Sequence, residues 1–205
     1  MIKKQNHILI VTLFLLLGCG KESKYWSFRP NENTGKDAII SAGNPKENFA
    51  TSANLHMLSL SVNDSIPNDQ RFLLRFGFRT IPENTVIDSA FIYLFALEAG
   101  HLGKNNSFVT YEIDEFWITK EVNWENQPSI RQNTRREYEA PKDKNQNYKI
   151  DVTDFVNDVL RKKIENHGFL FRLEDEKKSY KGLKFHSSNS KTEKLRPKLE
   201  VFYKE

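Results

Sequence analysis

The sequence of 205 residues is poor in cysteine, glycine and proline, with one, nine and seven of these residues. A single thiol cannot form an internal disulfide, and it cannot supply a zinc site built from several thiolates. The core of this protein must therefore be held together by apolar and aromatic packing. The sequence shows no low-complexity segment and no internal repeat.

The chain also has no large excess of positive or negative charge. Lysine and arginine together number 31, aspartate and glutamate 27, and the formal net charge is +4. A nucleic-acid-binding protein would carry a stronger basic excess, so we predict no nucleic-acid partner. Recognition of anions by this chain must come from a local cluster of cations.

The most apolar stretch, residues 8–17, has ten residues, whereas a membrane-spanning helix needs about 20. Two lysines precede this stretch, and Gly18 and the lone Cys19 follow it, as in a secretory signal. The run 16–19 resembles the lipobox of bacterial lipoproteins, whose cysteine takes a diacylglycerol and becomes the new N-terminus. The sequence therefore predicts a signal peptide over 1–18 and lipidation of Cys19. It also predicts lipid anchoring at the bacterial outer membrane or cell surface.

Aromatic residues are abundant: the chain has 15 Phe, seven Tyr and three Trp. Residues 71–79 alternate between two faces, which is typical of a strand with one face in the core. The predicted core face carries Phe72, Leu74, Phe76 and Phe78. The opposite face carries three arginines, Arg71, Arg75 and Arg79.

Residues 86–97 are apolar on both faces, which predicts a central strand covered on both sides. Further strands are predicted over residues 38–41, 55–62, 107–113, 168–173, 183–186 and 198–203. Apolar residues at helical spacing predict one helix within 152–164, capped by Asp151 or Thr153 and stopped by Gly168.

Many short strands with one short helix indicate an all-β fold, an antiparallel β-sandwich similar to a jelly roll. We predict that this domain spans residues 37–205. Residues 19–36 are polar and are expected to form a tether, with some anchoring through Tyr25, Trp26 and Phe28.

Four groups of motifs resemble the DNRLRE family, which overlaps carbohydrate-binding module family 96. They are QRFLLRF at 70–76 with IPENTVIDSAFIYL at 81–94, WITKEVNWENQP at 117–128, YKIDVT at 148–153 with GFLF at 168–171, and FHSS at 185–188 with RPKLEV at 196–201. The resemblance implies a jelly-roll sandwich on a secreted or surface protein. It also implies binding of a polysaccharide, which for some members is an acidic one such as alginate.

The three arginines of residues 71–79 are the best candidates for binding such a polymer. Guanidinium groups on one strand face lie about 7 Å apart and match carboxylates bidentately. A uronate polymer presents carboxylates at regular intervals. The alternative is a solvated or salt-bridged outer sheet face.

Two aromatic residues are candidate platforms for stacking on sugar rings. Trp117 lies in an expected loop, and Tyr180 lies among cations that include Lys184. The alternatives are that Trp117 and Trp124 anchor the core or the loop, and that Tyr180 belongs to a solvated turn. The predicted carbohydrate-binding residues are therefore Arg71, Arg75, Arg79, Trp117, Tyr180 and Lys184.

Catalytic and metal signatures are weak. Helix capping explains Asp151 and Asp154, and the histidines show no ligand spacing. The sequence has no Gly-x-Ser-x-Gly motif and no Asp-x-Asp-x-Asp calcium loop. We therefore predict no catalytic residue, no metal and no cofactor, although a sandwich has room for a structural calcium ion.

The sequence as a whole predicts a lipid-anchored, non-catalytic protein that binds an acidic polysaccharide. Two alternatives stay open. One is a structural or adhesion lipoprotein that packs on a protein partner, which a large apolar patch would favour. The other is a polysaccharide-processing enzyme, which two carboxylates in a deep groove beside a Tyr or His would favour.

Overall fold

The computed structural model describes residues 24–31, 34, 36–60, 68–83, 85–98, 100–176 and 180–203. Their strands are β1 (Lys24–Phe28), β2 (Lys36–Ser41), β3 (Asn54–Ser59), β4 (Asp69–Arg75), β5 (Ile87–Leu94), β6 (Phe108–Glu112), β7 (Arg136–Tyr138), β8 (Tyr148–Asp151), β9 (Phe169–Leu173), β10 (Lys181–His186) and β11 (Lys198–Tyr203). The helices are α1 (Thr153–Leu160) and the short 3-10 helices η1 (Gln132–Thr134) and η2 (Glu193–Leu195). Among the described residues, no helix has the length and apolar character needed to cross a membrane.

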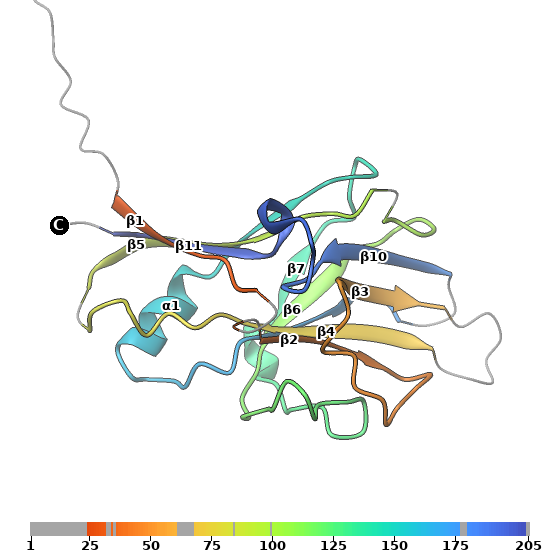
Figure 1. The fold of residues 1–205 in the computed structure, drawn as a ribbon, viewed down its shortest axis with the longest axis horizontal. Helices are drawn as coiled ribbons and strands as arrows, with labels where there is room; N and C mark the ends of the chain where they lie inside the picture. Colours follow the sequence, from red (N-terminus) through yellow and green to blue (C-terminus); the bar gives the residue numbers. More distant parts are fainter. Residues whose placement is uncertain are drawn as a thin grey trace, which may run out of the picture.

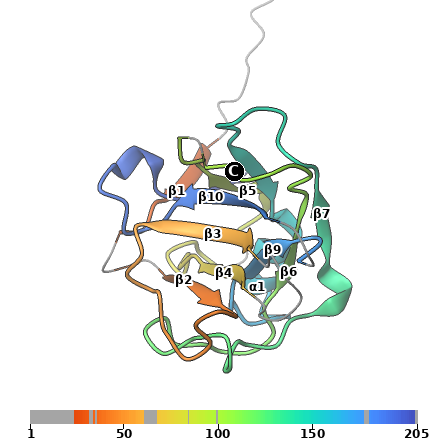
Figure 2. The ribbon, with the colours of Figure 1, turned by 90° about the vertical axis from the view of Figure 1, so that its right-hand side faces the viewer.

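The strands form two antiparallel sheets. In Figure 1, β1, β5 and β11 lie above β2 and β4, and the seven-stranded sheet curls upward to β10. The four-stranded sheet has the order β1-β11-β5-β8. The seven-stranded sheet has the order β10-β3-β4-β9-β6-β7, with β2 added beside β4. Its strands β10, β3 and β4 lie one below the other in the turned view of Figure 2. The predicted all-β sandwich with one short α-helix is confirmed.

Aromatic side chains build the core between the sheets. Phe72 and Phe171 are both 0% exposed and stack with ring centroids 4.4 Å apart. Tyr148 of the four-stranded sheet packs its ring against Phe108 and Phe185 of the other sheet, at 4.8 and 5.9 Å. This ring therefore joins the two layers of the sandwich.

The predicted register of β4 is confirmed. The four residues expected to enter the core are all buried in it: Phe72, Leu74, Phe76 and Phe78. The strand itself ends at Arg75, so Phe76 and Phe78 reach the core from the turn that follows. Leu73 on the other face is also 0% exposed, which one-sided alternation does not predict.

Residues 113–131 cover the outer face of the seven-stranded sheet, at the bottom of Figure 1. Trp117 and Val122 from this segment form a second core cluster with Leu73 and with residues of β2, β6 and β9. The strand β4 is therefore buried on both faces.

The prediction that residues 86–97 are covered on both sides is wrong. The inner face of β5 is buried, but Phe91 and Tyr93 on its outer face are only partly buried and belong to neither core cluster. The covering segment packs on the other sheet. Burial within the sandwich therefore does not explain why the outer face of β5 is apolar.

Part of the expected tether is folded. Residues 24–28 form β1, which pairs along its whole length with β11, from Lys24 beside Tyr203 to Phe28 beside Leu199. Trp26 stacks on Tyr203 with ring centroids 4.0 Å apart. The short edge strands β7 and β8 were also not predicted.

The helix α1 is shorter than its apolar pattern suggests. Its N-cap residue is Val152, and Oδ1 of Asp151 accepts hydrogen bonds from the backbone N–H and the hydroxyl of Thr153. Gly168 does not end the helix, which stops at Leu160. With φ +81° and a would-be Cβ 2.3 Å from the carbonyl oxygen of Leu74, Gly168 instead permits β9 to approach β4.

We predict that Phe72→Ala lowers the free energy of unfolding by about 3–5 kcal/mol, because it leaves a cavity in the shared core. Phe116→Ala is the matched control, since its ring is 62% exposed. It should change stability by about 0.5 kcal/mol or less. Urea unfolding followed by tryptophan fluorescence measures both, and equal effects would contradict this description of the core.

Candidate functional site: a cationic groove

An open groove of about 1010 Å³ lies where β4 ends. Its walls are the turn after β4, the exposed ring of Phe116 and the chain from the end of α1 to His167. Five lysine and arginine side chains line it, against two glutamates. We call this feature the cationic groove.

Three of its cations have no carboxylate partner among the residues that the structure describes. The pairing of β2 with β4 places Lys36 directly opposite Arg75, and Arg79 follows in the turn. None of these three side chains has a hydrogen bond or ion pair with any residue that the structure describes. Like charges directly opposite each other on a sheet are destabilising, so this arrangement favours an anion from outside.

The two other cations of the groove are paired within the chain. Lys162 pairs with Glu83 at 2.9 Å, and Lys163 pairs with Asp158 at 2.8 Å. Glu165 lies 3.3 Å from Nε2 of His167. The unbalanced positive charge therefore concentrates at Lys36, Arg75 and Arg79.

Aromatic rings hold the Arg75 side chain in place. Its guanidinium carbon lies 5.4 Å from the ring centre of Phe116 and 5.2 Å from that of Trp117. Burial, and to a lesser extent the charge of Arg79, lower the pKa of Arg75 from its ordinary value. An arginine nevertheless stays protonated at neutral pH, so Arg75 offers a partly desolvated, oriented cation.

Two buried polar atoms of the groove have no hydrogen-bond partner in the described part of the chain. Asn166 donates from Nδ2 to the carbonyl oxygen of Phe76, 2.8 Å away. Its Oδ1 and the Nδ1 of His167 are buried and have no hydrogen-bond partner among the described residues. Burial lowers the pKa of His167, so its imidazole is mainly neutral at pH 7.

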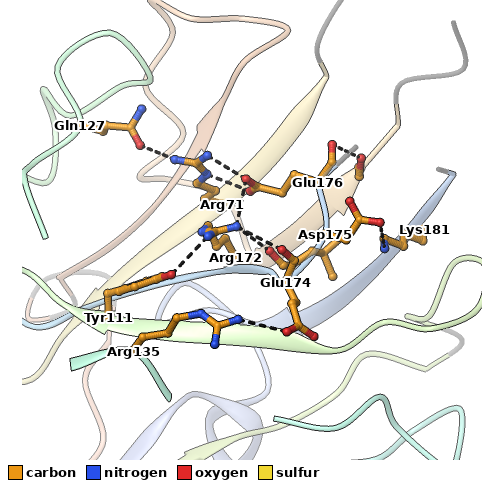
Figure 3. Close-up of polar contacts among 11 residues, drawn as sticks. Arg71, Tyr111, Gln127, Arg135, Arg172, Glu174, Asp175, Glu176 and Lys181 are labelled. Carbon is orange, nitrogen blue, oxygen red and sulfur yellow. Dashed lines mark hydrogen bonds and ion pairs between the residues drawn. The ribbon is translucent and has the colours of Figure 1, made fainter. Parts of the chain in front are cut away.

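Arg71 is part of an internal network and not of the groove (Figure 3). Its guanidinium donates two hydrogen bonds of 2.8 Å to the carboxylate of Glu176 and a third to Oε1 of Gln127. It also lies 4.5 Å from the ring centre of Trp124. The expected row of three arginines is thus divided: Arg71 is salt-bridged, whereas Arg75 and Arg79 face the groove.

Trp117 is not a platform for sugars, contrary to the prediction. Its side chain is 4% exposed, and its indole N–H donates to the backbone carbonyl of His167 at 2.8 Å. The exposed ring at this place belongs to Phe116, which was not predicted. Side chains of adjacent residues in an extended segment point in opposite directions. If Trp117 had been predicted to be buried, Phe116 would have been predicted to be exposed.

The remaining predicted residues do not join the groove. Tyr180 is 62% exposed, but it precedes Lys181, which lies beside Ser59 and thus near the start of β4. Arg75 lies six residues further along β4, about 20 Å away. Lys184 lies on β10, with β3 between it and β4. Cys19 lies outside the described residues.

Metal ligands do not gather in the described part of the chain. No group of three or more His, Cys, Asp or Glu side chains there could hold a metal ion. The groove places cations without a described partner beside the exposed ring of Phe116, an arrangement that can bind an anion.

Comparison with known protein families identifies a match over most of the chain. The model of carbohydrate-binding module family 96 matches residues 29–203. No curated protein matches the chain.

We predict that Arg71→Ala lowers the free energy of unfolding by about 1.5–3 kcal/mol, because it leaves the carboxylate of Glu176 without its bidentate partner. The Glu176 side chain is 11% exposed, so water replaces that partner poorly. Arg71→Lys should restore only part of the loss, since an ammonium lacks the planar fork. Arg79→Ala is the control and should cost about 0.5 kcal/mol or less in the same urea titration. A neutral Arg71→Ala would contradict this structural role.

Proposed function

The chain belongs to carbohydrate-binding module family 96. We propose that it is a lipid-anchored, extracytoplasmic protein that binds an acidic polysaccharide. Membership of the family supports carbohydrate binding by a non-catalytic module. The acidic ligand, the lipid anchor and the groove as the site are our own inferences.

One observation carries the choice of an acidic ligand. Lys36, Arg75 and Arg79 gather at one groove with no carboxylate partner in the described part of the chain. A carboxylate or sulfate of the polymer would offset their mutual repulsion. Guanidinium groups bind such anions through paired hydrogen bonds, which are stronger than bonds between neutral groups.

Phe116 gives the groove a second means of recognition. Its ring is 62% exposed and stands at the groove wall, 6.3 Å from the imidazole of His167. An aromatic face can stack on the apolar side of a sugar ring, which does not depend on charge. We therefore expect the affinity to have a salt-sensitive part from the cations and a salt-resistant part from Phe116.

A lipid anchor at Cys19 would hold this groove close to a membrane. The support for it is the basic start, the short apolar stretch and the lipobox-like run that ends at the only thiol of the chain. The outer membrane or cell surface is the location that we propose, because extracellular polysaccharides are encountered there.

Polysaccharide cleavage is a second candidate, which the pair of Glu165 and His167 at the groove favours. Glu83 is the other carboxylate of the groove, but it is already paired with Lys162. Incubation with alginate and pectate, followed by detection of new chain ends, separates the two functions. Steady release of chain ends would replace the binding function with an enzymatic one.

We predict that the purified full-length protein binds alginate and pectate more tightly than a neutral glucan, and that this preference weakens as salt rises. Exposed charges are screened beyond about 8 Å at physiological ionic strength, so contact pairs should dominate. Arg75→Gln and Arg79→Gln should each lower the affinity about 10- to 100-fold, the loss of one charge-assisted hydrogen bond.

Lys104→Gln is the matched control for these charge changes, because Lys104 is exposed and lies outside the groove. Lys104→Gln should leave the affinity for alginate unchanged when all variants are compared by calorimetric titration. Phe116→Ala should weaken binding at low and at high salt alike. Equal affinity for the neutral glucan, or no dependence on salt, would remove the arginines from the site. Absence of binding to any glycan would favour a structural or adhesion role with a protein partner.

We predict that Cys19 carries the lipid. Cys19→Ala should leave the protein unprocessed or release it from the membrane fraction, because no other thiol is available. Mass spectrometry of the N-terminal peptide measures the modification directly. A mature chain with an unmodified Cys19 would rule out the anchor.

A further inference from the structure

The outer face of the four-stranded sheet carries a row of aromatic rings that crosses its strands. Tyr25 of β1 lies beside Phe202 of β11, with ring centroids 5.3 Å apart. Phe202 in turn lies 6.2 Å from Phe91 of β5. Tyr93 follows Phe91 on the same face of β5.

Two lysines accompany this row. The ammonium of Lys149 lies 3.7 Å from the ring centre of Phe91, and that of Lys198 lies 4.2 Å from the ring centre of Tyr93. Lys198 also pairs with Glu200. Lys149 has no ion pair with any residue of the described part of the chain. The face thus combines aromatic rings with ammonium groups, one of them unpaired.

No described segment packs over these rings. Phe91, Tyr93 and Phe202 belong to neither core cluster, and Tyr25 is 54% exposed. The outer face of the other sheet is covered by residues 113–131 instead. An apolar sheet face that its own chain leaves uncovered indicates contact with something outside the molecule.

The chain enters the fold at this face. β1 begins at Lys24, five residues after Cys19, and an extended chain of that length spans at most about 18 Å. Lys24 lies beside Tyr203, which lies beside Ile87, so the start of β5 is at the same end of the sheet. Val86, just before β5, is 64% exposed. A lipid on Cys19 therefore brings the end of the sheet with Tyr25 and Val86 close to the bilayer.

We propose that this aromatic face docks on the phospholipid surface to which Cys19 is anchored. The proposal rests on the lipid anchor inferred above. Aromatic rings with an apolar body partition into the interface of a bilayer, and lysines extend their ammonium groups to the phosphates. A tether of five residues gives an effective concentration in the millimolar range or above, so a weak intrinsic affinity is enough to populate the docked state.

Docking in this way gives the molecule an orientation. In Figure 1, β1, β5 and β11 form the upper layer, while residues 113–131 lie at the bottom, beyond β2 and β4. The cationic groove lies at the end of the sandwich, between the turn after β4 and the end of α1. No described lining residue of the groove belongs to the four-stranded sheet, so docking through that sheet would leave the groove open to a polymer.

The test uses the acylated full-length protein in vesicles of phosphatidylethanolamine and phosphatidylglycerol. Acylation of Cys19 leaves no other thiol, so an introduced cysteine accepts a fluorescent label at one place. Ser27→Cys puts the label on the exposed face of β1, and Lys120→Cys puts it in the segment that covers the other sheet. Nitroxide-labelled phospholipids should quench the label at position 27 at least threefold more strongly than the label at position 120.

A matched pair of variants tests which side chains hold the face on the bilayer. Tyr25→Ser with Val86→Ser should reduce the quenching at position 27 by half or more. Ile118→Ser with Tyr180→Ser is the control, since these two are similarly exposed but lie elsewhere. The control should leave the quenching unchanged.

Three outcomes would overturn the proposal. Equal quenching at positions 27 and 120, in protein that still floats with the vesicles, rejects docking but leaves the lipid anchor intact. Protection of the label at position 27 by a soluble polysaccharide assigns the face to a glycan. Disulfide cross-linking of two copies through position 27 assigns it to self-association. Loss of flotation itself would contradict the anchor and therefore the proposed function.

Discussion

Phe72 stacks on Phe171 between neighbouring strands at the centre of the sandwich, and the alternation of β4 depends on this contact. A slip of one residue would turn every side chain of the strand to the other face, which would place Arg71 and Arg75 in an aromatic core. Burial of an unpaired guanidinium there is costly, so the register is strongly specified. The position of Arg75 in the groove therefore follows from a packing constraint on the opposite face of the same strand.

What happens to the outer face of β4 depends on residues 113–131. This segment buries Leu73 beneath Trp117 and Val122, and it holds Arg71 between Gln127 and Trp124. Its cover ends at Arg75, whose guanidinium lies beside the rings of Phe116 and Trp117. Two arginines of one strand face thus have different roles, because one lies under the covering segment and the other lies at its rim.

Much of this fold follows from local patterns in the sequence. The alternation of residues 71–79 predicts the register of β4, and helical spacing predicts α1, because both depend on neighbouring residues along one element. What covers a sheet face depends on a distant segment, and local alternation does not report it. For that reason Leu73 and Trp117 were not expected to be buried together, and Phe91 and Tyr93 were not expected to be left uncovered. Lys36 joins Arg75 only through the pairing of β2 with β4, which the sequence does not specify.

The outer faces of the two sheets differ in whether the chain itself covers them. Each has an outer face with apolar residues that the shared core cannot take up. The seven-stranded sheet is covered by its own chain, and the edge of that cover creates a groove with unbalanced positive charge. The four-stranded sheet keeps its aromatic rings uncovered at the end where the chain enters the fold. The described lining of the groove comes from β2, β4, the turn after β4, Phe116 and the end of α1, so the groove and the aromatic face share no described residue. This separation is what the proposed function needs, because a polymer in the groove and a membrane at the aromatic face would not compete for the same side chains.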